Sequence, residues 1–127
     1  MKIAIFENEY ESVRGTFNTA NQINFDGNLD ISLYSSSQNA NLERINDFDA
    51  IFIDISLGAR SDLDGFALIQ KIQSINEKIV SKIIILTGNN KIGEILASKK
   101  IDQTKIQIII KPSDYEEITN AIKNIKK

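Results

Sequence analysis

Short runs of apolar, mostly β-branched residues recur along the chain and are separated by more polar segments. All but the run at residues 29–34 are apolar throughout, which is typical of strands buried on both faces of a parallel sheet. The run at 29–34 is a weaker candidate of the same kind. The predicted strands are Lys2–Phe6, Leu29–Tyr34, Ala50–Ile55, Lys82–Thr87 and Ile106–Ile110.

The segments that follow these runs carry apolar residues at helical spacing. Asp62 or Asp64 is expected to cap the third helix, and Ser113 the fifth, with Glu116 completing a capping box. The apolar positions of the predicted helices are Tyr10, Val13 and Phe17; Leu42 and Ile45; Phe66, Ile69, Ile72 and Ile75; Ile92, Ile95 and Leu96; and Tyr115, Ile118, Ile122 and Ile125.

Alternation of strand and helix predicts a fold of the α/β class, a doubly wound parallel sheet with right-handed crossovers and helices on both faces. The 127 residues contain no linker or repeat, so we expect one domain over residues 1–127. Such sheets bind ligands beyond the carboxyl ends of their strands, where the strand order reverses. Functional residues are therefore expected directly after each strand.

Composition narrows the chemistry, because the chain has no Cys and no His. Zinc sites of the usual kind, thiol catalysis and imidazole acid–base catalysis are excluded. Residues 1–64 carry 4 basic and 11 acidic side chains, and residues 65–127 carry 11 and 6. No direct nucleic-acid binding is expected of a chain that is not basic as a whole. The apolar runs are too short for membrane insertion and no secretory signal is present, which predicts a cytoplasmic protein.

Polar side chains stand at four of the five predicted strand ends. These are Glu7-Asn8-Glu9, Asp54, Thr87 and Lys111. Carboxylate and amide oxygens suit a hard divalent cation, whereas a hydroxyl and an ammonium group suit phosphoryl oxygens. One carboxylate could accept a phosphoryl group.

Each of these residues alone also has a purely structural interpretation. Strand-end Asp and Thr often cap the next helix, Lys111 could be a surface lysine, and acids after the first strand favour a helix N-terminus. Their joint occurrence at four strand ends favours a functional site. The single proline, Pro112, follows Lys111, and a cis bond there could set the direction of the lysine.

The ordered set of motifs resembles the receiver domain of two-component response regulators. The resemblance covers essentially the whole chain at nearly the spacing of that family. It rests on the segments Ile3–Glu9, Asp49–Asp54, Asp64–Phe66, Ile84–Gly88 and Ile109–Pro112.

This resemblance implies a flavodoxin-like (βα)5 fold with strand order 2-1-3-4-5. It implies that Asp54 accepts a phosphoryl group from a sensor histidine kinase or histidine phosphotransfer protein. A downstream protein partner would bind the fourth helix, fifth strand and fifth helix. The implied site comprises Glu7, Asn8, Asp54 and the Ser56 backbone carbonyl around Mg²⁺ or Mn²⁺, Thr87 and Lys111 on the phosphoryl oxygens, and Ser56 and Asn89 as residues that tune phosphoryl lifetime.

Three positions depart from the family pattern. Asn8 replaces an acid, which lowers the negative charge offered to a cation. The segment Ile55–Leu63 is about three residues longer than the common loop, and its Arg60 is a candidate partner contact or simply an exposed side chain. Ile108 stands where the family usually has an aromatic residue, so the usual coupling to Thr87 is altered or absent.

The main functional hypothesis is a stand-alone phosphoacceptor receiver that is not an enzyme beyond catalysing its own phosphorylation and dephosphorylation. The alternative is a pseudo-receiver, an interaction module that is never phosphorylated. A small flavodoxin-like enzyme or nucleotide binder is disfavoured, because no Gly-rich phosphate loop follows the first strand and its acids would repel phosphates.

Overall fold

The apolar runs form the strands of a parallel sheet. In the computed structural model, residues 1–101 and 104–125 are described, so the domain predicted for 1–127 includes residues 102–103 and 126–127 outside the described part. The strand order within the described residues is β2-β1-β3-β4-β5, which confirms the predicted fold class and topology. The strands are β1 Lys2–Phe6, β2 Asp30–Tyr34, β3 Ala50–Asp54, β4 Ile83–Thr87 and β5 Gln107–Ile110.

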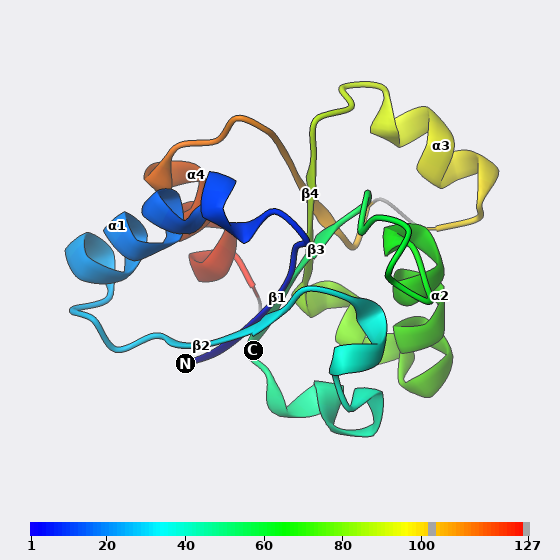
Figure 1. The fold of residues 1–127 in the computed structure, drawn as a ribbon, viewed down its shortest axis with the longest axis horizontal. Coiled ribbons are helices and arrows are strands. Elements are labelled where there is room, and N and C mark those ends of the chain that lie inside the picture. The colour runs from blue at the N-terminus through cyan, green and yellow to red at the C-terminus, as the bar shows by residue number, and fades with distance from the viewer. Residues whose placement is uncertain (102–103, 126–127) are drawn as a thin grey trace.

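Helices cover both faces of this sheet, as Figure 1 shows. The helices α1 (Arg14–Asn24) and α4 (Tyr115–Lys123) pack on one face against side chains such as Ile5 and Phe52. On the other face, α2 (Gly65–Ile75) and α3 (Ile92–Ser98) belong to a second apolar cluster. Successive residues of β1, β3 and β4 point to alternate clusters, so both faces of these strands are buried.

The structure decides between the two predicted caps of α2 and corrects the predicted cap of α4. Asp64 caps α2, because its carboxylate accepts a hydrogen bond from the Ala67 N–H (2.8 Å). The cap of α4 is Asp114 and not Ser113, and it forms its capping box with Glu117 and not Glu116. Aspartate caps a helix as well as serine does, so a shift of the start by one residue preserves both bonds.

The second predicted helix is wrong. Residues 35–49 contain two 3-10 turns instead, η2 (Ser37–Asn39) and η3 (Leu42–Asp47). Ile45 is the one buried residue of η3, so an α-helix here would have little apolar surface to bury. The Lys82 ammonium group holds the end of this segment by donating to the Phe48 carbonyl (3.0 Å).

The remaining irregular elements lie next to regular ones. The first predicted helix begins with a 3-10 turn, η1 (Tyr10–Ser12), before α1, and a further 3-10 turn, η4 (Glu77–Lys82), precedes β4. No helix within residues 1–101 and 104–125 combines the length and the hydropathy that crossing a bilayer requires.

Candidate functional site

The carboxyl ends of β1, β3, β4 and β5 bring four of the predicted site residues to one edge of the sheet. Glu7 follows β1, Asp54 is the last residue of β3, Thr87 is the last residue of β4, and Lys111 follows β5. The Lys111 N–H donates to the Thr87 carbonyl (2.7 Å), so the pairing of β4 with β5 continues to the lysine itself.

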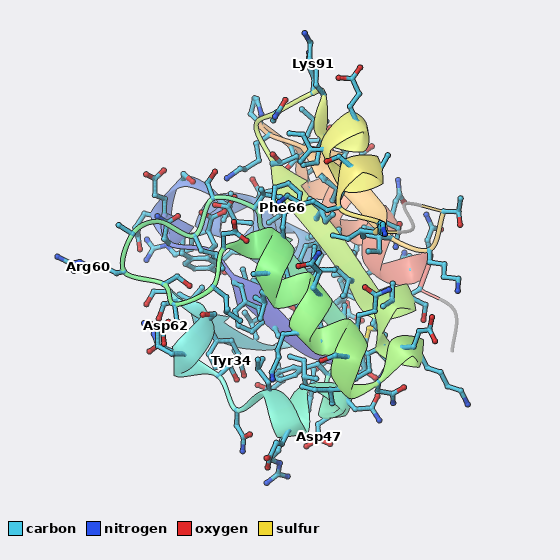
Figure 2. The ribbon with its side chains drawn as sticks, turned by 90° about the vertical axis from the view of Figure 1, so that its right-hand side faces the viewer. Tyr34, Asp47, Arg60, Asp62, Phe66 and Lys91 are labelled. Atoms are coloured by element: carbon cyan, nitrogen blue, oxygen red, sulfur yellow. The ribbon has the colours of Figure 1, made fainter. Side chains whose placement is uncertain are left out.

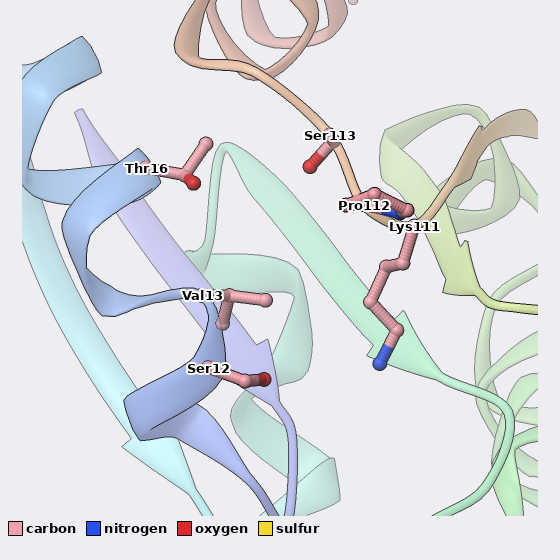
Figure 3. Close-up of a pocket in the computed structure, with 6 residues that line it drawn as sticks. All are labelled: Ser12, Val13, Thr16, Lys111, Pro112 and Ser113. Atoms are coloured by element: carbon pink, nitrogen blue, oxygen red, sulfur yellow. The ribbon is translucent and has the colours of Figure 1, made fainter.

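Lys111 joins two buried carboxylates. Its Nζ lies 3.2 Å from Oε2 of Glu7 and 3.5 Å from Oδ2 of Asp54. Glu7 and Asp54 are 1% and 4% exposed, so solvent screens these contacts weakly. Figure 3 shows the lysine side chain leaving the turn at Pro112 and ending over β3. The Lys111–Pro112 peptide bond is cis, the conformation suggested from the sequence.

The charges at this edge shift the pKa values of two groups. The pKa of Glu7 is raised to about 7 by burial, by the hydrogen bond to Asp54 and by the charge of Asp54, against the lowering effect of the Glu9 N–H and Lys111. Burial lowers the pKa of Lys111, but the Asp54 and Glu7 carboxylates outweigh it, so the pKa of the ammonium group lies above its usual value. Lys111 therefore stays charged.

Backbone N–H groups hold the Asp54 carboxylate and the Thr87 hydroxyl in place. The Ser56 N–H donates to Oδ1 of Asp54 (3.0 Å), and the Asn89 N–H donates to Oγ1 of Thr87 (3.1 Å). Because Oγ1 accepts that bond, the hydroxyl proton of buried Thr87 is available to another acceptor. The Asn89 side-chain oxygen accepts a hydrogen bond from the Lys91 N–H (2.9 Å). Ser56, two residues after Asp54, is exposed.

Gly65 packs directly on the backbone that carries Asp54, a role that the sequence analysis did not assign. Its N–H donates to the Ile55 carbonyl (3.0 Å). A Cβ at this position would lie 2.4 Å from Cα of Ile55 and 2.6 Å from the Asp54 carbonyl oxygen. The segment Ile55–Asp64, here called the β3–α2 loop, therefore begins and ends next to the carboxyl end of β3. The motif Asp64–Phe66, which was noted in the sequence, contains this glycine and could have indicated its role.

Asn8, another of the predicted ligands, lies against the β3–α2 loop. Its side chain is exposed, and its Nδ2 lies against Gly58, where a Cβ would be 2.8 Å away. It lines a hollow of about 530 Å³ beside the β3–α2 loop. The other lining residues are Ser35, Ser36, Gln38, Leu57, Gly58, Ala59 and Arg60.

The donor set at this edge suits a hard divalent cation. Glu7 and Asp54 supply carboxylate oxygens, and Asn8 and the Ser56 carbonyl are the neutral oxygen donors nearest in sequence. Within the described part of the chain, no three acidic side chains gather into a cluster by themselves. A cation here would therefore depend on amide or carbonyl oxygens in addition to the two carboxylates.

A second hollow, of about 320 Å³, lies between the start of α1 and the turn at Pro112. Ser12, Thr16 and Ser113 contribute hydroxyl groups to it, as Figure 3 shows. The Ser12 hydroxyl donates to the Glu9 carbonyl (2.7 Å), and the ammonium group of Lys111 is held by Glu7 and Asp54. This hollow therefore borders the site without adding a charged group to it.

Solved structures share this fold over nearly the whole chain. A response regulator receiver domain from Clostridium thermocellum is 22% identical with a TM-score of 0.68, and covers 98% of this chain and 92% of its own. A CheY-like receiver domain protein from Methanospirillum hungatei JF-1 is 19% identical with a TM-score of 0.66, over 96% and 90%. The chain therefore has the receiver-domain fold of response regulators.

NtrX from Brucella abortus is similar at 21% identity, with a TM-score of 0.72 over 98% of this chain. The chain spans about a quarter (26%) of that protein's length. The sequence itself matches no protein-family model and no curated protein.

Proposed function

We propose that this chain is a receiver that accepts a phosphoryl group on Asp54 from a phosphohistidine of a sensor histidine kinase or histidine phosphotransfer protein. The observation that carries the proposal is the ammonium group of Lys111 between the buried carboxylates of Glu7 and Asp54. It lies at the carboxyl edge of a sheet with the receiver topology. Phosphoryl transfer needs this combination of an acceptor oxygen and fixed positive charge.

The residues divide the reaction between them. An oxygen of Asp54 attacks phosphorus, the bond between phosphorus and the donor imidazole nitrogen breaks, and the imidazole keeps the electron pair of that bond. Lys111 neutralises negative charge that develops on the phosphoryl oxygens, and the Thr87 hydroxyl donates a hydrogen bond to one of them. Ser56 and Asn89 stay the predicted positions for tuning the hydrolysis of the product.

Mg²⁺ or Mn²⁺ is the cofactor we propose, held by Glu7, Asn8, Asp54 and the Ser56 carbonyl. When bound, it supplies positive charge to the transferring group. The raised pKa of Glu7 supports this assignment, because it reflects the burial of the Glu7 carboxyl group and, after that, its closeness to the Asp54 carboxylate. A divalent cation would offset both effects.

The signal would pass to a downstream protein partner in the cytoplasm. The face formed by α3, β5 and α4 is the corresponding surface, and Ile110 of β5 is 36% exposed on the strand there. Ile108, where an aromatic residue is usual, packs against the apolar cluster on the α2 and α3 side of the sheet. Output would therefore use a change in this surface other than the movement of an aromatic ring.

Incubation with acetyl phosphate and Mg²⁺ tests the proposal. We expect a mass increase of one phosphoryl group that is stable to acid and removed by hydroxylamine, as for an acyl phosphate. Asp54→Asn should lose the increase completely, since an amide oxygen cannot form this bond. Asp62→Asn, which changes an exposed aspartate in the β3–α2 loop, should keep it.

Wild-type protein that gains no mass at saturating Mg²⁺, while still folded by circular dichroism, would contradict the phosphoacceptor function. That result would favour the alternative, an interaction module that is never phosphorylated.

A further inference from the structure

The β3–α2 loop is fastened to the turn η2 by two serines. The Ser37 N–H donates to Oγ of Ser61 (2.9 Å), and Oγ of Ser37 accepts from the Leu63 N–H (3.0 Å). The Ser61 hydroxyl in turn donates to the Leu63 carbonyl (2.6 Å). Ser37 is 2% exposed, so these bonds are shielded from water. The end of the loop is thus tied to a segment that follows β2.

Gln38 holds the neighbouring stretch of the same loop. Its Nε2 donates to the Arg60 carbonyl (2.7 Å), and its Oε1 accepts from the Asp62 N–H (2.9 Å). One side-chain amide therefore pairs with the backbone on both sides of Ser61. Figure 2 shows the Arg60 side chain pointing away from the molecule, while its backbone is held. We call Ser37, Gln38 and Ser61 the loop clip.

The start of the loop lies against Asn8. Leu57 is 1% exposed and anchors the loop in the apolar cluster that contains α2. The next residue, Gly58, has a φ of +85° and approaches Asn8 so closely that a Cβ would lie 2.8 Å from its Nδ2. Clip and anchor together fix the loop backbone that Asn8 touches.

We propose that Ser37, Gln38 and Ser61 are positioning residues that act through the β3–α2 loop on Asn8. The clip keeps Gly58 against the Asn8 amide, and so fixes this side chain at the edge of the sheet that carries Glu7 and Asp54. The clip thus fastens the part of the loop that follows its contact with Asn8.

The expected effect of the clip on the lifetime of a phosphoryl group on Asp54 rests on the proposed function. Hydrolysis requires a water oxygen to attack phosphorus, after which the bond to the Asp54 oxygen breaks and inorganic phosphate leaves. With the loop in place, Asp54 is 4% exposed. A loop that opens more often admits water more often, so weakening the clip should shorten the phosphoryl lifetime.

Two readouts that do not require phosphorylation test the clip. Trypsin should cut after exposed Arg60 at least about fivefold faster in Ser61→Ala and in Gln38→Ala, because each variant loses at least two hydrogen bonds and a net loss of about 1 kcal/mol in a local opening already gives that factor. The side-chain amide signal of Asn8 in a ¹⁵N correlation spectrum, assigned by its loss in Asn8→Asp, should shift in both variants. Gly58→Ala, whose methyl group meets the amide directly, should shift the same signal.

Two further variants separate positioning from general destabilisation. Ser61→Thr keeps the hydroxyl and should behave as wild type. Ser74→Ala removes a hydroxyl that bonds within α2 to the Lys71 carbonyl, and should leave both readouts unchanged. A third readout is the lifetime of the acyl phosphate, expected to fall about fivefold in Ser61→Ala and Gln38→Ala.

Unchanged cleavage at Arg60 together with an unshifted Asn8 signal in both clip variants would overturn the proposal. Faster cleavage with an unshifted Asn8 signal would overturn it as well, since the clip would then hold the loop without positioning Asn8. A wild-type protein that cannot be phosphorylated counts against the proposed function alone, because the first two readouts still decide the role of the clip.

Discussion

Replacing Gly65 with alanine is expected to destabilise the fold by about 3 kcal/mol or more, at the upper end of overpacking effects. The new Cβ would lie 2.4 Å from Cα of Ile55 and 2.6 Å from the Asp54 carbonyl oxygen. Both are backbone atoms, so relief requires α2 or the end of β3 to move. Urea unfolding followed by circular dichroism measures the change.

Gly15 provides the matched control, because it also lies near the start of a helix but has nothing within 4 Å of its hypothetical Cβ. Gly15→Ala should be neutral or stabilise by about 0.5–1 kcal/mol, the usual gain from alanine in a helix. Equal stability of Gly65→Ala and wild type would show that the close approach of α2 to the end of β3 is not required.

Glu7→Gln should stabilise the protein at pH 8 in the absence of divalent cations. A carboxyl group whose pKa is raised on folding stabilises the fold below its unfolded value of 4.5 and loses that contribution as the pH rises through the folded value of about 7. The difference corresponds to about 3 kcal/mol. Glutamine has no proton to lose, so the variant lacks this loss.

The measurement is the free energy of unfolding of both proteins between pH 4 and pH 8. The advantage of Glu7→Gln should be absent near pH 4, grow between pH 4.5 and 7, and then stay constant. Glu94→Gln, which changes a glutamate in the first turn of α3 far along the chain from the site, should show no such growth. Wild type and Glu7→Gln with parallel stability curves would mean that Glu7 titrates in the folded protein as it does in the unfolded chain.

The strands were predictable because their burial on both faces leaves a direct trace in the sequence. β1 has the predicted bounds, and the other strands differ from prediction by one residue at an end. Residues 35–49 were not predictable in the same way. Leu42 and Ile45 have helical spacing, but two apolar positions do not distinguish an α-helix from a 3-10 turn that buries Ile45 alone.

The candidate site also has a part that could be predicted from the sequence and a part that could not. Strand ends meet at one edge of a parallel sheet by topology, which is why Glu7, Asp54, Thr87 and Lys111 could be placed together without coordinates. The contact of Asn8 with Gly58 could not be placed in this way, because the path of the β3–α2 loop depends on bonds to Ser37 and Gln38 about 24 residues earlier in the chain. Hydrogen bonds between loops leave no periodic pattern to read.

Lys111 connects the ends of four strands at the carboxyl edge of the sheet. Its backbone is bonded to the last residue of β4, and its ammonium group contacts carboxylates carried by β1 and β3. Added negative charge on Asp54 would draw the ammonium group away from Glu7. The same movement would strain the hydrogen bond that joins the Lys111 backbone to Thr87 at the end of β4. A chemical change at the end of β3 would then also affect the ends of β1, β4 and β5, because the Lys111 side chain connects all four.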